Sequence, residues 1–138
     1  AVFDHCTIFA KRGGYLTAAS TPEHVPYGFV FINCKITGTA PEGSVYLGRP
    51  WRPFAKTAFL NCHFDAIVHK KGWHNWNKTD AQATVKYIEY NNSGPGAKRD
   101  ERVEWSIFIN DNEAIDFNTN HIFRSTVASG SEFLDWQP

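Results

Sequence analysis

The sequence predicts an all-β protein, a right-handed parallel β-helix (a solenoid) with about 28 residues per coil and a C-terminal tail that contains short helical segments. Three segments align without gaps at that spacing: AVFDHCTIF (1–9), FVFINCKIT (29–37) and TAFLNCHFD (57–65). Each is rich in Val, Ile or Phe, as strands are. A second repeated strand, YLTAAS (15–20) and YLGRPW (46–51), lies between them. Because no amphipathic helix separates the strands, stacked coils are favoured over a βαβ sheet.

The spacing between copies varies along the chain. The second strand recurs after 31 residues rather than 28, so the turn GTAPEGS (38–44) is expected to carry about three extra residues. A fourth, degraded copy is predicted at VKYIEYNNS (85–93), with Tyr87 at the phenylalanine position and Tyr90 at the cysteine position.

The three cysteines, Cys6, Cys34 and Cys62, share one repeat position. Stacked one per coil, they are predicted to form an interior ladder of small apolar side chains. Disulfide or metal use is the alternative, but the odd number and the wide spacing match no zinc pattern.

The C-terminal third departs from the repeat. In NDNEAIDF (110–117), Asn110 and Glu113 have the spacing of a capping box and predict a short helix. SEFLDWQP (131–138) offers a final amphipathic segment, and both pieces are expected to cover the C-terminal end of the solenoid. Residue 2 already belongs to a repeat strand, so residues 1–138 are expected to be the C-terminal part of a single β-helix domain whose N-terminal coils are missing from this chain.

Composition excludes several classes of partner. Lys and Arg total 14 and Asp and Glu total 14, which leaves no basic field for nucleic acid. The longest apolar runs are far shorter than the ~20 residues of a membrane helix. We therefore expect neither nucleic-acid nor membrane binding, and a monomer.

YLGRPW places Arg49 and Trp51 on one face of a strand, because residues two apart share a face, while Pro50 points the other way. Ala18 and Ser20 are expected one coil below, where small side chains leave a groove. Arginine suits a bidentate grip on a carboxylate, and an indole suits the apolar face of a sugar ring. The alternative is a surface Arg–Trp stack of the cation–π type.

Several motifs together resemble the C-terminal half of the pectinesterase (pectin methylesterase) family, in the phrasing of its bacterial branch. They occur in the family's order: YLGRPW, GWHNWN (72–77), EYNNSGPGA (89–97), RVEW (102–105) and the tail FLDWQP. The resemblance spans essentially the whole chain and also implies a right-handed parallel β-helix.

The resemblance implies an extracellular or secreted esterase, periplasmic if bacterial, that removes methyl groups from pectin (methyl-esterified homogalacturonan) and needs no metal or other cofactor. In the family one aspartate attacks the ester carbonyl, a second acts as general acid and base, and glutamines stabilise the oxyanion. Arg49 would hydrogen-bond the nucleophilic aspartate and Trp51 would line the sugar groove. Trp73 is a further candidate for the groove, with a buried core indole as the alternative.

The family's catalytic aspartates and glutamines belong to coils that precede this sequence. Asp4, Asp65 and Asp80 lie in no matching motif, so none is assigned the nucleophile's role. The isolated 138 residues are therefore predicted to be inactive. Two alternatives stay open: another β-helix polysaccharide lyase or hydrolase, and a non-catalytic β-helix that binds pectin.

Overall fold

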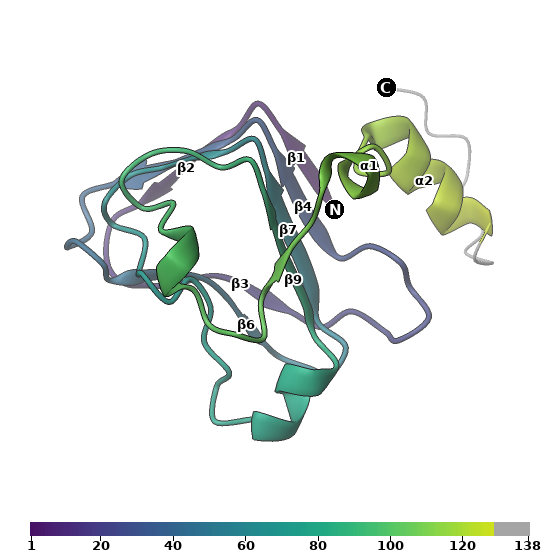
Figure 1. Ribbon diagram of the computed structural model, residues 1–138, viewed down its shortest axis with the longest axis horizontal. Coiled ribbons are helices and arrows are strands. Elements are labelled where there is room, and N and C mark those ends of the chain that lie inside the picture. Colours follow the sequence, from purple (N-terminus) through teal and green to yellow (C-terminus); the bar gives the residue numbers. More distant parts are fainter. Residues whose placement is uncertain (129–138) are drawn as a thin grey trace.

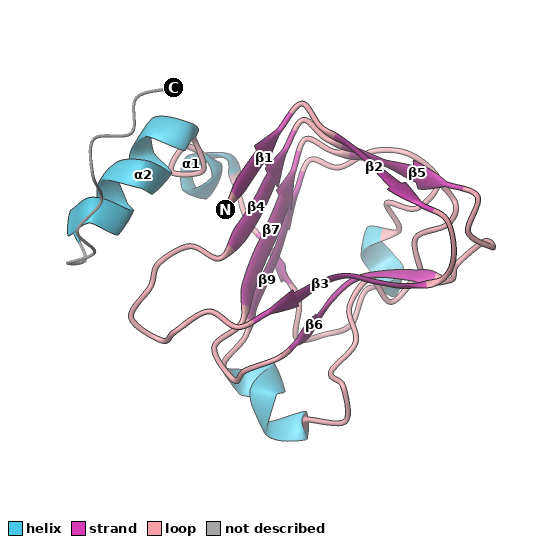
Figure 2. Ribbon diagram, turned by 180° about the vertical axis from the view of Figure 1, so that it is seen from behind, coloured by secondary structure: helices cyan, strands magenta, loops and turns pink. Residues whose placement is uncertain are grey.

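The computed structural model describes residues 1–128, which form a right-handed parallel β-helix of about three coils (Figures 1 and 2). Every strand pair is parallel, and the strands stack into three sheets. The largest sheet contains β1 (Val2–Asp4), β4 (Phe29–Ile32), β7 (Lys56–Leu60), β9 (Lys86–Tyr90) and β10 (Ile107–Phe108). The second contains β2 (Thr7–Ala10), β5 (Lys35–Gly38) and β8 (His63–Phe64), and the third β3 (Gly14–Ala19) and β6 (Val45–Pro50).

The predicted 28-residue repeat is confirmed by the strand register. Phe3 pairs with Phe31, and Phe31 pairs with Phe59. Their rings form an interior stack, with centroids 4.7 and 4.4 Å apart and planes within 8° of parallel. Core aromatic pairs of this kind stabilise a fold by about 0.5–1.5 kcal/mol beyond the area they bury, so the stack favours this register over a slipped one.

The longer turn at 38–44 is also confirmed. Ala10 pairs with Gly38, a spacing of 28 residues, whereas Gly14 pairs with Val45, a spacing of 31. The three additional residues therefore lie between β5 and β6, and they do not disturb the sheets on either side.

The predicted register of the fourth copy is wrong by two residues. Phe59 pairs with Glu89, and Tyr87 pairs with Thr57. The physical reason is the loop before β9, which contains the 3-10 helix η1 (Thr79–Ala83) and lengthens this coil. Tyr87 stacks instead on Trp73, at 4.3 Å between ring centroids. Tyr87 is therefore a core aromatic residue, as predicted, but it stacks on Trp73 and not on the phenylalanine column.

One corner of each coil has left-handed backbone. The residues there are His5, Asn33, Asn61 and Asn91, with φ of 51°, 54°, 53° and 48°. Asparagine tolerates this conformation better than most residues, and the Asn91 side-chain amide donates to Asn61 Oδ1 at 2.8 Å. These corners turn the chain from the first sheet into the second at the same height in every coil.

The cysteine ladder follows directly after these corners and is confirmed as interior packing. Cys34 and Cys62 are buried, and all three thiols are free. Each buried thiol donates to a carbonyl one coil below: Cys34 Sγ to Phe3 O at 3.3 Å and Cys62 Sγ to Phe31 O at 3.6 Å. Asn92 continues the column, donating from Nδ2 to Phe59 O at 3.1 Å.

A buried ion pair lies at the last coil. Arg102 Nε donates to Glu89 Oε1 at 2.7 Å, and the two side chains are 1% and 3% exposed. Arg102 also donates to the carbonyls of Lys70 and Gly96, at 3.0 and 2.9 Å. Gly72, with φ of +71°, is needed here because an added Cβ would lie 2.5 Å from Arg102 Cδ. The pair therefore ties three loops to the final strands of the largest sheet.

The C-terminal helices do not lie where the sequence suggested. The capping box is confirmed: Asn110 accepts from the backbone N–H of Glu113, whose carboxylate accepts from the backbone N–H of Asn110, at the start of α1 (Asp111–Ala114). However, α1 and α2 (Thr119–Ala128) lie beside β1 and β4 (Figure 1). Ile122 packs in one cluster with Val30, Ala58 and Leu60 on the outer face of the sheet.

The expectation that this region covers the end of the solenoid is therefore wrong for these helices, because their apolar side chains find an apolar outer sheet face. Val103 and Trp105, after the 3-10 helix η2 (Arg99–Glu101), pack on the core at that end instead. The predicted segment 131–138 lies outside the described residues. Among residues 1–128, no helix is long and apolar enough to span a membrane.

Removing one member of the buried ion pair should be strongly destabilising. Arg102→Met leaves the Glu89 carboxylate buried without a counter-charge, which lowers the free energy of unfolding by about 3–5 kcal/mol. The double variant Glu89→Leu/Arg102→Met should recover part of that loss. Urea denaturation measures both, with Lys98→Met as the control, because its ion pair with Glu101 is half-exposed and 4.0 Å long. An Arg102→Met protein as stable as the control would contradict this account.

The cysteine ladder predicts selective thiol reactivity. Burial raises the pKa of Cys62 to about 12 and also raises the pKa of Cys34, and only the thiolate reacts. Ellman's reagent at pH 8 should therefore modify Cys6, which is half-buried, and reach Cys34 and Cys62 only in denaturant. Cys6→Ser should abolish the native-state reaction; rapid modification of two or more thiols in the folded wild type would refute the ladder.

Candidate functional site

Arg49 lies on β6 directly above Ala18 of β3, in the register that the sequence predicts. Its guanidinium carbon is 4.0 Å from the centre of the Tyr15 ring and 3.6 Å from the centre of the Trp76 ring. The charged group is therefore held between two aromatic rings. Each cation–π contact contributes about 0.5–2 kcal/mol, more as water is excluded.

The N–H groups of Arg49 are unused. No hydrogen bond or ion pair joins Arg49 to another side chain or carbonyl within residues 1–128, and its Nε is buried without a partner. A buried donor left unsatisfied costs about 1–3 kcal/mol. Because two rings already contact the guanidinium, we expect an acceptor to approach it along its N–H groups, in its own plane. That is the geometry in which a carboxylate binds arginine bidentately.

Trp51 is 56% exposed, and its ring centre lies 5.4 Å from that of Trp76 at an angle of 60°. Lys78 Nζ donates to the carbonyls of Pro50 and Trp51, at 3.1 and 2.7 Å, and so ties the following loop to the end of β6. The arginine–tryptophan stack considered from the sequence is thus present, but Trp76 makes it rather than Trp51. The groove role of Trp51 stays a prediction.

The glycine and proline of YLGRPW have steric roles. A Cβ on Gly48 would lie 2.3 Å from Thr17 Oγ1 and 3.2 Å from the Trp73 ring, so only glycine lets this ring approach the strand. Pro50 points inward and is buried, opposite to Arg49. Arg49 is therefore placed by a strand that is closely packed underneath it.

Trp73 is not a groove residue. It is 1% exposed and stacks on Tyr87 inside the core. Its neighbour Trp76, three residues later in GWHNWN, takes the surface position that was considered for Trp73. Sequence reasoning missed Trp76 and Tyr15; the available signals were the second tryptophan of that motif and the recurrence of Tyr15 as Tyr46 in the second strand.

Tyr15 also begins a column of rings that runs across three successive coils. Tyr15 stacks on Tyr46 at 5.4 Å, and Tyr46 stacks on His69 at 4.3 Å. His74 meets both tyrosines edge-on, at 5.7 and 5.3 Å. Burial, with the nearby charges of Lys70 and Lys71 as further causes, lowers the pKa of His69. His69 is therefore held neutral near pH 7.

Two of the three aspartates that were left unassigned, Asp4 and Asp65, contact residues other than Arg49, and the third, Asp80, lies in the first turn of η1. Asp4 forms an ion pair with His5 at 2.7 Å. Asp65 accepts hydrogen bonds from Thr37 and His63. The Thr37 bond is the main cause that lowers the pKa of Asp65. Within residues 1–128, no three His, Cys, Asp or Glu side chains are grouped so that they could hold a metal ion.

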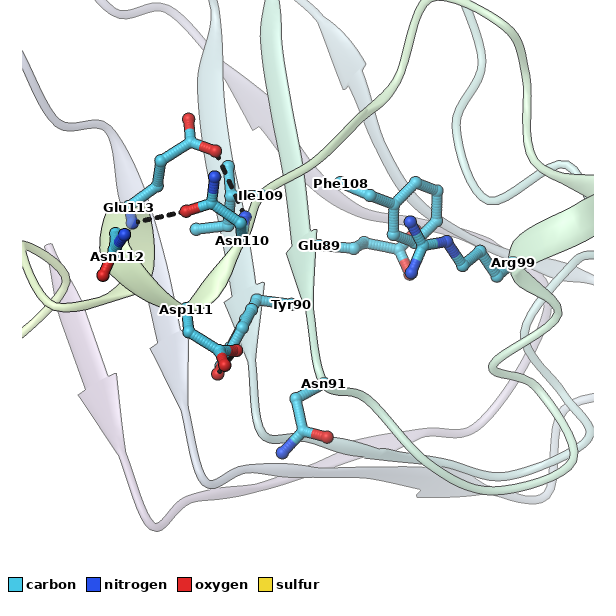
Figure 3. Close-up of a pocket in the computed structure, with 10 residues that line it drawn as sticks. All are labelled: Glu89, Tyr90, Asn91, Arg99, Phe108, Ile109, Asn110, Asp111, Asn112 and Glu113. Atoms are coloured by element: carbon cyan, nitrogen blue, oxygen red, sulfur yellow. Dashed lines mark hydrogen bonds between the residues drawn. The ribbon is translucent and has the colours of Figure 1, made fainter.

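A cavity of about 800 Å³ lies elsewhere, between β9, β10 and α1 (Figure 3). Its polar groups satisfy one another: Tyr90 donates to Asp111 at 2.7 Å, and Asn110 and Glu113 form the capping box. Arg99 covers the face of Phe108, at 4.6 Å from its ring centre. The unsatisfied donors of Arg49 are the stronger indication of a functional site.

Comparison with known proteins gives one consistent result. The family model described as "Pectinesterase" matches residues 1–126. Pectinesterase 31 of Arabidopsis thaliana is 39% identical over 124 residues, covering 89% of this chain and 39% of that protein. Putative pectinesterase 11 of the same plant is 43% identical over 120 residues, covering 85% and 33%. These plant relatives give no support to the expected likeness to the bacterial branch.

The solved structures agree. Pectin methylesterase from carrot superposes with a TM-score of 0.80 at 25% identity, covering 96% of this chain and 47% of that one. The enzyme from Yersinia enterocolitica superposes with a TM-score of 0.72 at 27% identity, covering 89% and 47%. The chain spans less than half the length of these relatives. Its sequence and its fold together show that it belongs to the pectinesterase family.

Proposed function

We propose that this chain is the C-terminal part of the β-helix of a pectin methylesterase, a carboxylic ester hydrolase that converts methyl-esterified pectin to pectate and methanol. The observation that carries the proposal is the guanidinium of Arg49, held between two rings with its donors unpaired among the described residues. The unpaired N–H donors of such a group can bind a carboxylate.

The carboxylate in this proposal is the nucleophilic aspartate, supplied by a coil that precedes Ala1 in the complete protein. An arginine within hydrogen-bond distance lowers the pKa of a carboxyl group and keeps it ionised. The ionised carboxylate attacks the ester carbonyl, the second aspartate protonates the departing methoxide to give methanol, and the same aspartate then takes a proton from the water that hydrolyses the acyl–enzyme. Arg49 would hold the nucleophile at the correct angle through both steps.

Trp51 is proposed to line the sugar groove, because its indole is exposed and its ring centre lies 5.4 Å from that of Trp76, which contacts Arg49. A pectin methylesterase of similar fold, 21% identical to this chain, has been solved in complex with hexasaccharides. Pectin is accordingly the proposed partner. We further propose that the complete protein is a monomer and is secreted to the cell wall, or to the periplasm if its source is bacterial.

Methanol release from methylated pectin tests the function. The 138-residue chain alone should release none, and the protein extended by its preceding coils should release methanol at least 100-fold faster than Arg49→Ala in the same protein. Arg52→Ala is the matched control, because Arg52 is exposed and three residues away; it should retain full activity.

Other products would identify the alternatives. Unsaturated uronides would indicate a lyase, and new reducing ends would indicate a hydrolase. Pectin binding without turnover by the extended protein would indicate a non-catalytic β-helix. Any of these results would overturn the proposal, as would an extension that contains no aspartate within reach of Arg49.

A further inference from the structure

The Trp76 ring contacts the guanidinium of Arg49 from the coil after β6, whereas Tyr15 belongs to the coil before it, and the proposed function gives Trp76 no role. We propose that Trp76 is a positioning residue that orients Arg49 for the carboxylate it receives. This inference rests on the proposed function for its catalytic consequence but not for the contact itself.

Arg49 needs such a device because nothing else fixes its orientation. Its side chain has several rotatable bonds, and no hydrogen bond within residues 1–128 restrains it. Tyr15 covers one face, at 4.0 Å, and is itself supported by the stack on Tyr46. With that face alone covered, the guanidinium could still swing outward into solvent. The Trp76 ring, with its centre 3.6 Å from the guanidinium carbon, supplies a second contact.

Trp76 is held in place by its own loop. Trp76 and Asn77 both have left-handed backbone, with φ of 53° and 57°, which is uncommon for tryptophan. The backbone N–H of Trp76 donates to His74 Nδ1 at 2.9 Å, and the N–H of Asn77 donates to Asn75 Oδ1 at 2.9 Å. Strained backbone of this kind persists only where its surroundings maintain it.

Lys78 secures the other side of this loop. Its ammonium lies 4.7 Å from the centre of the Trp76 ring and donates to the carbonyls of Pro50 and Trp51. The loop 74–78 is thereby fastened to the strand end that carries Arg49. The result is a guanidinium that contacts two rings and whose N–H groups are left for a planar, bidentate acceptor.

The first test examines the contact in the 138-residue chain, without catalysis. In ¹⁵N-arginine-labelled protein, the Nε–H proton of Arg49 should resonate upfield of the other arginines, because it lies between two ring faces. Trp76→Leu should return it to the range of exposed arginines, and Trp76→Phe should restore most of the shift. Phe9→Leu, which removes an exposed aromatic ring on β2, is the control and should change nothing.

The second test uses the complete, active protein. Trp76→Leu should lower kcat about tenfold with little change in KM. The acid limb of the kcat/KM profile should move to higher pH, because a poorly oriented arginine no longer lowers the carboxylate's pKa. Trp76→Phe should recover most of both effects. A residue needed only for stability would lower the amount of active enzyme without moving the pH limb.

The two arms separate the possible failures. An Nε–H signal that is unaffected by Trp76→Leu overturns the positioning role whatever the enzyme does. A normal contact in a complete protein that releases no methanol overturns the proposed function instead. An active enzyme whose Trp76→Leu variant keeps the wild-type acid limb overturns the positioning role and leaves the proposed function intact.

Discussion

Parallel backbone pairing between successive coils is the constraint on which the rest of this structure depends. Each coil turns at a left-handed corner, at His5, Asn33, Asn61 and Asn91, so the strands that follow begin at equal heights. Cys34 and Cys62 then bind the carbonyls of the coil below. The corner and the thiol column fix the height of the second sheet. A longer loop after that sheet therefore does not change how the next strand pairs with the coil below. The extra residues at 38–44 therefore leave Arg49 above Ala18.

The same constraint explains where charge can be buried. The phenylalanine column ends at Phe59, and the next position in the register is Glu89. A carboxylate inside a solenoid is tolerated only with a close partner, and Arg102 supplies that partner at 2.7 Å while also binding loop carbonyls. Arg49 is the opposite case, since its partners among the described residues are rings alone. Arg102 thus stabilises the fold at the last coil. Arg49 keeps its hydrogen-bond donors free for an acceptor outside the described residues.

The sequence predicted the features that repeat and failed where the repeat ends. The phenylalanine and cysteine columns, the longer turn and the register of Arg49 over Ala18 follow from a fixed period, because identical coils must stack identically. Tyr87 was placed wrongly because the period changes by two residues in the coil containing η1, and a local pattern does not reveal loop length. Trp73 and Trp76 were equally unresolvable: both lie in a loop without alternation, so no strand pattern shows which indole points inward.

The packing beneath Arg49 also explains why such an unusual strand end is retained by the fold. Gly48 admits the Trp73 ring, which brings the loop 74–78 close enough for Trp76 to reach the guanidinium. Pro50 is buried, and its carbonyl accepts from Lys78. The two indoles of one motif therefore have separate roles: the buried Trp73 anchors the loop in the core, and the half-buried Trp76 covers the arginine. A Cβ at Gly48 would press on both Thr17 and the Trp73 ring, so the glycine supports Arg49 indirectly through the packing beneath it.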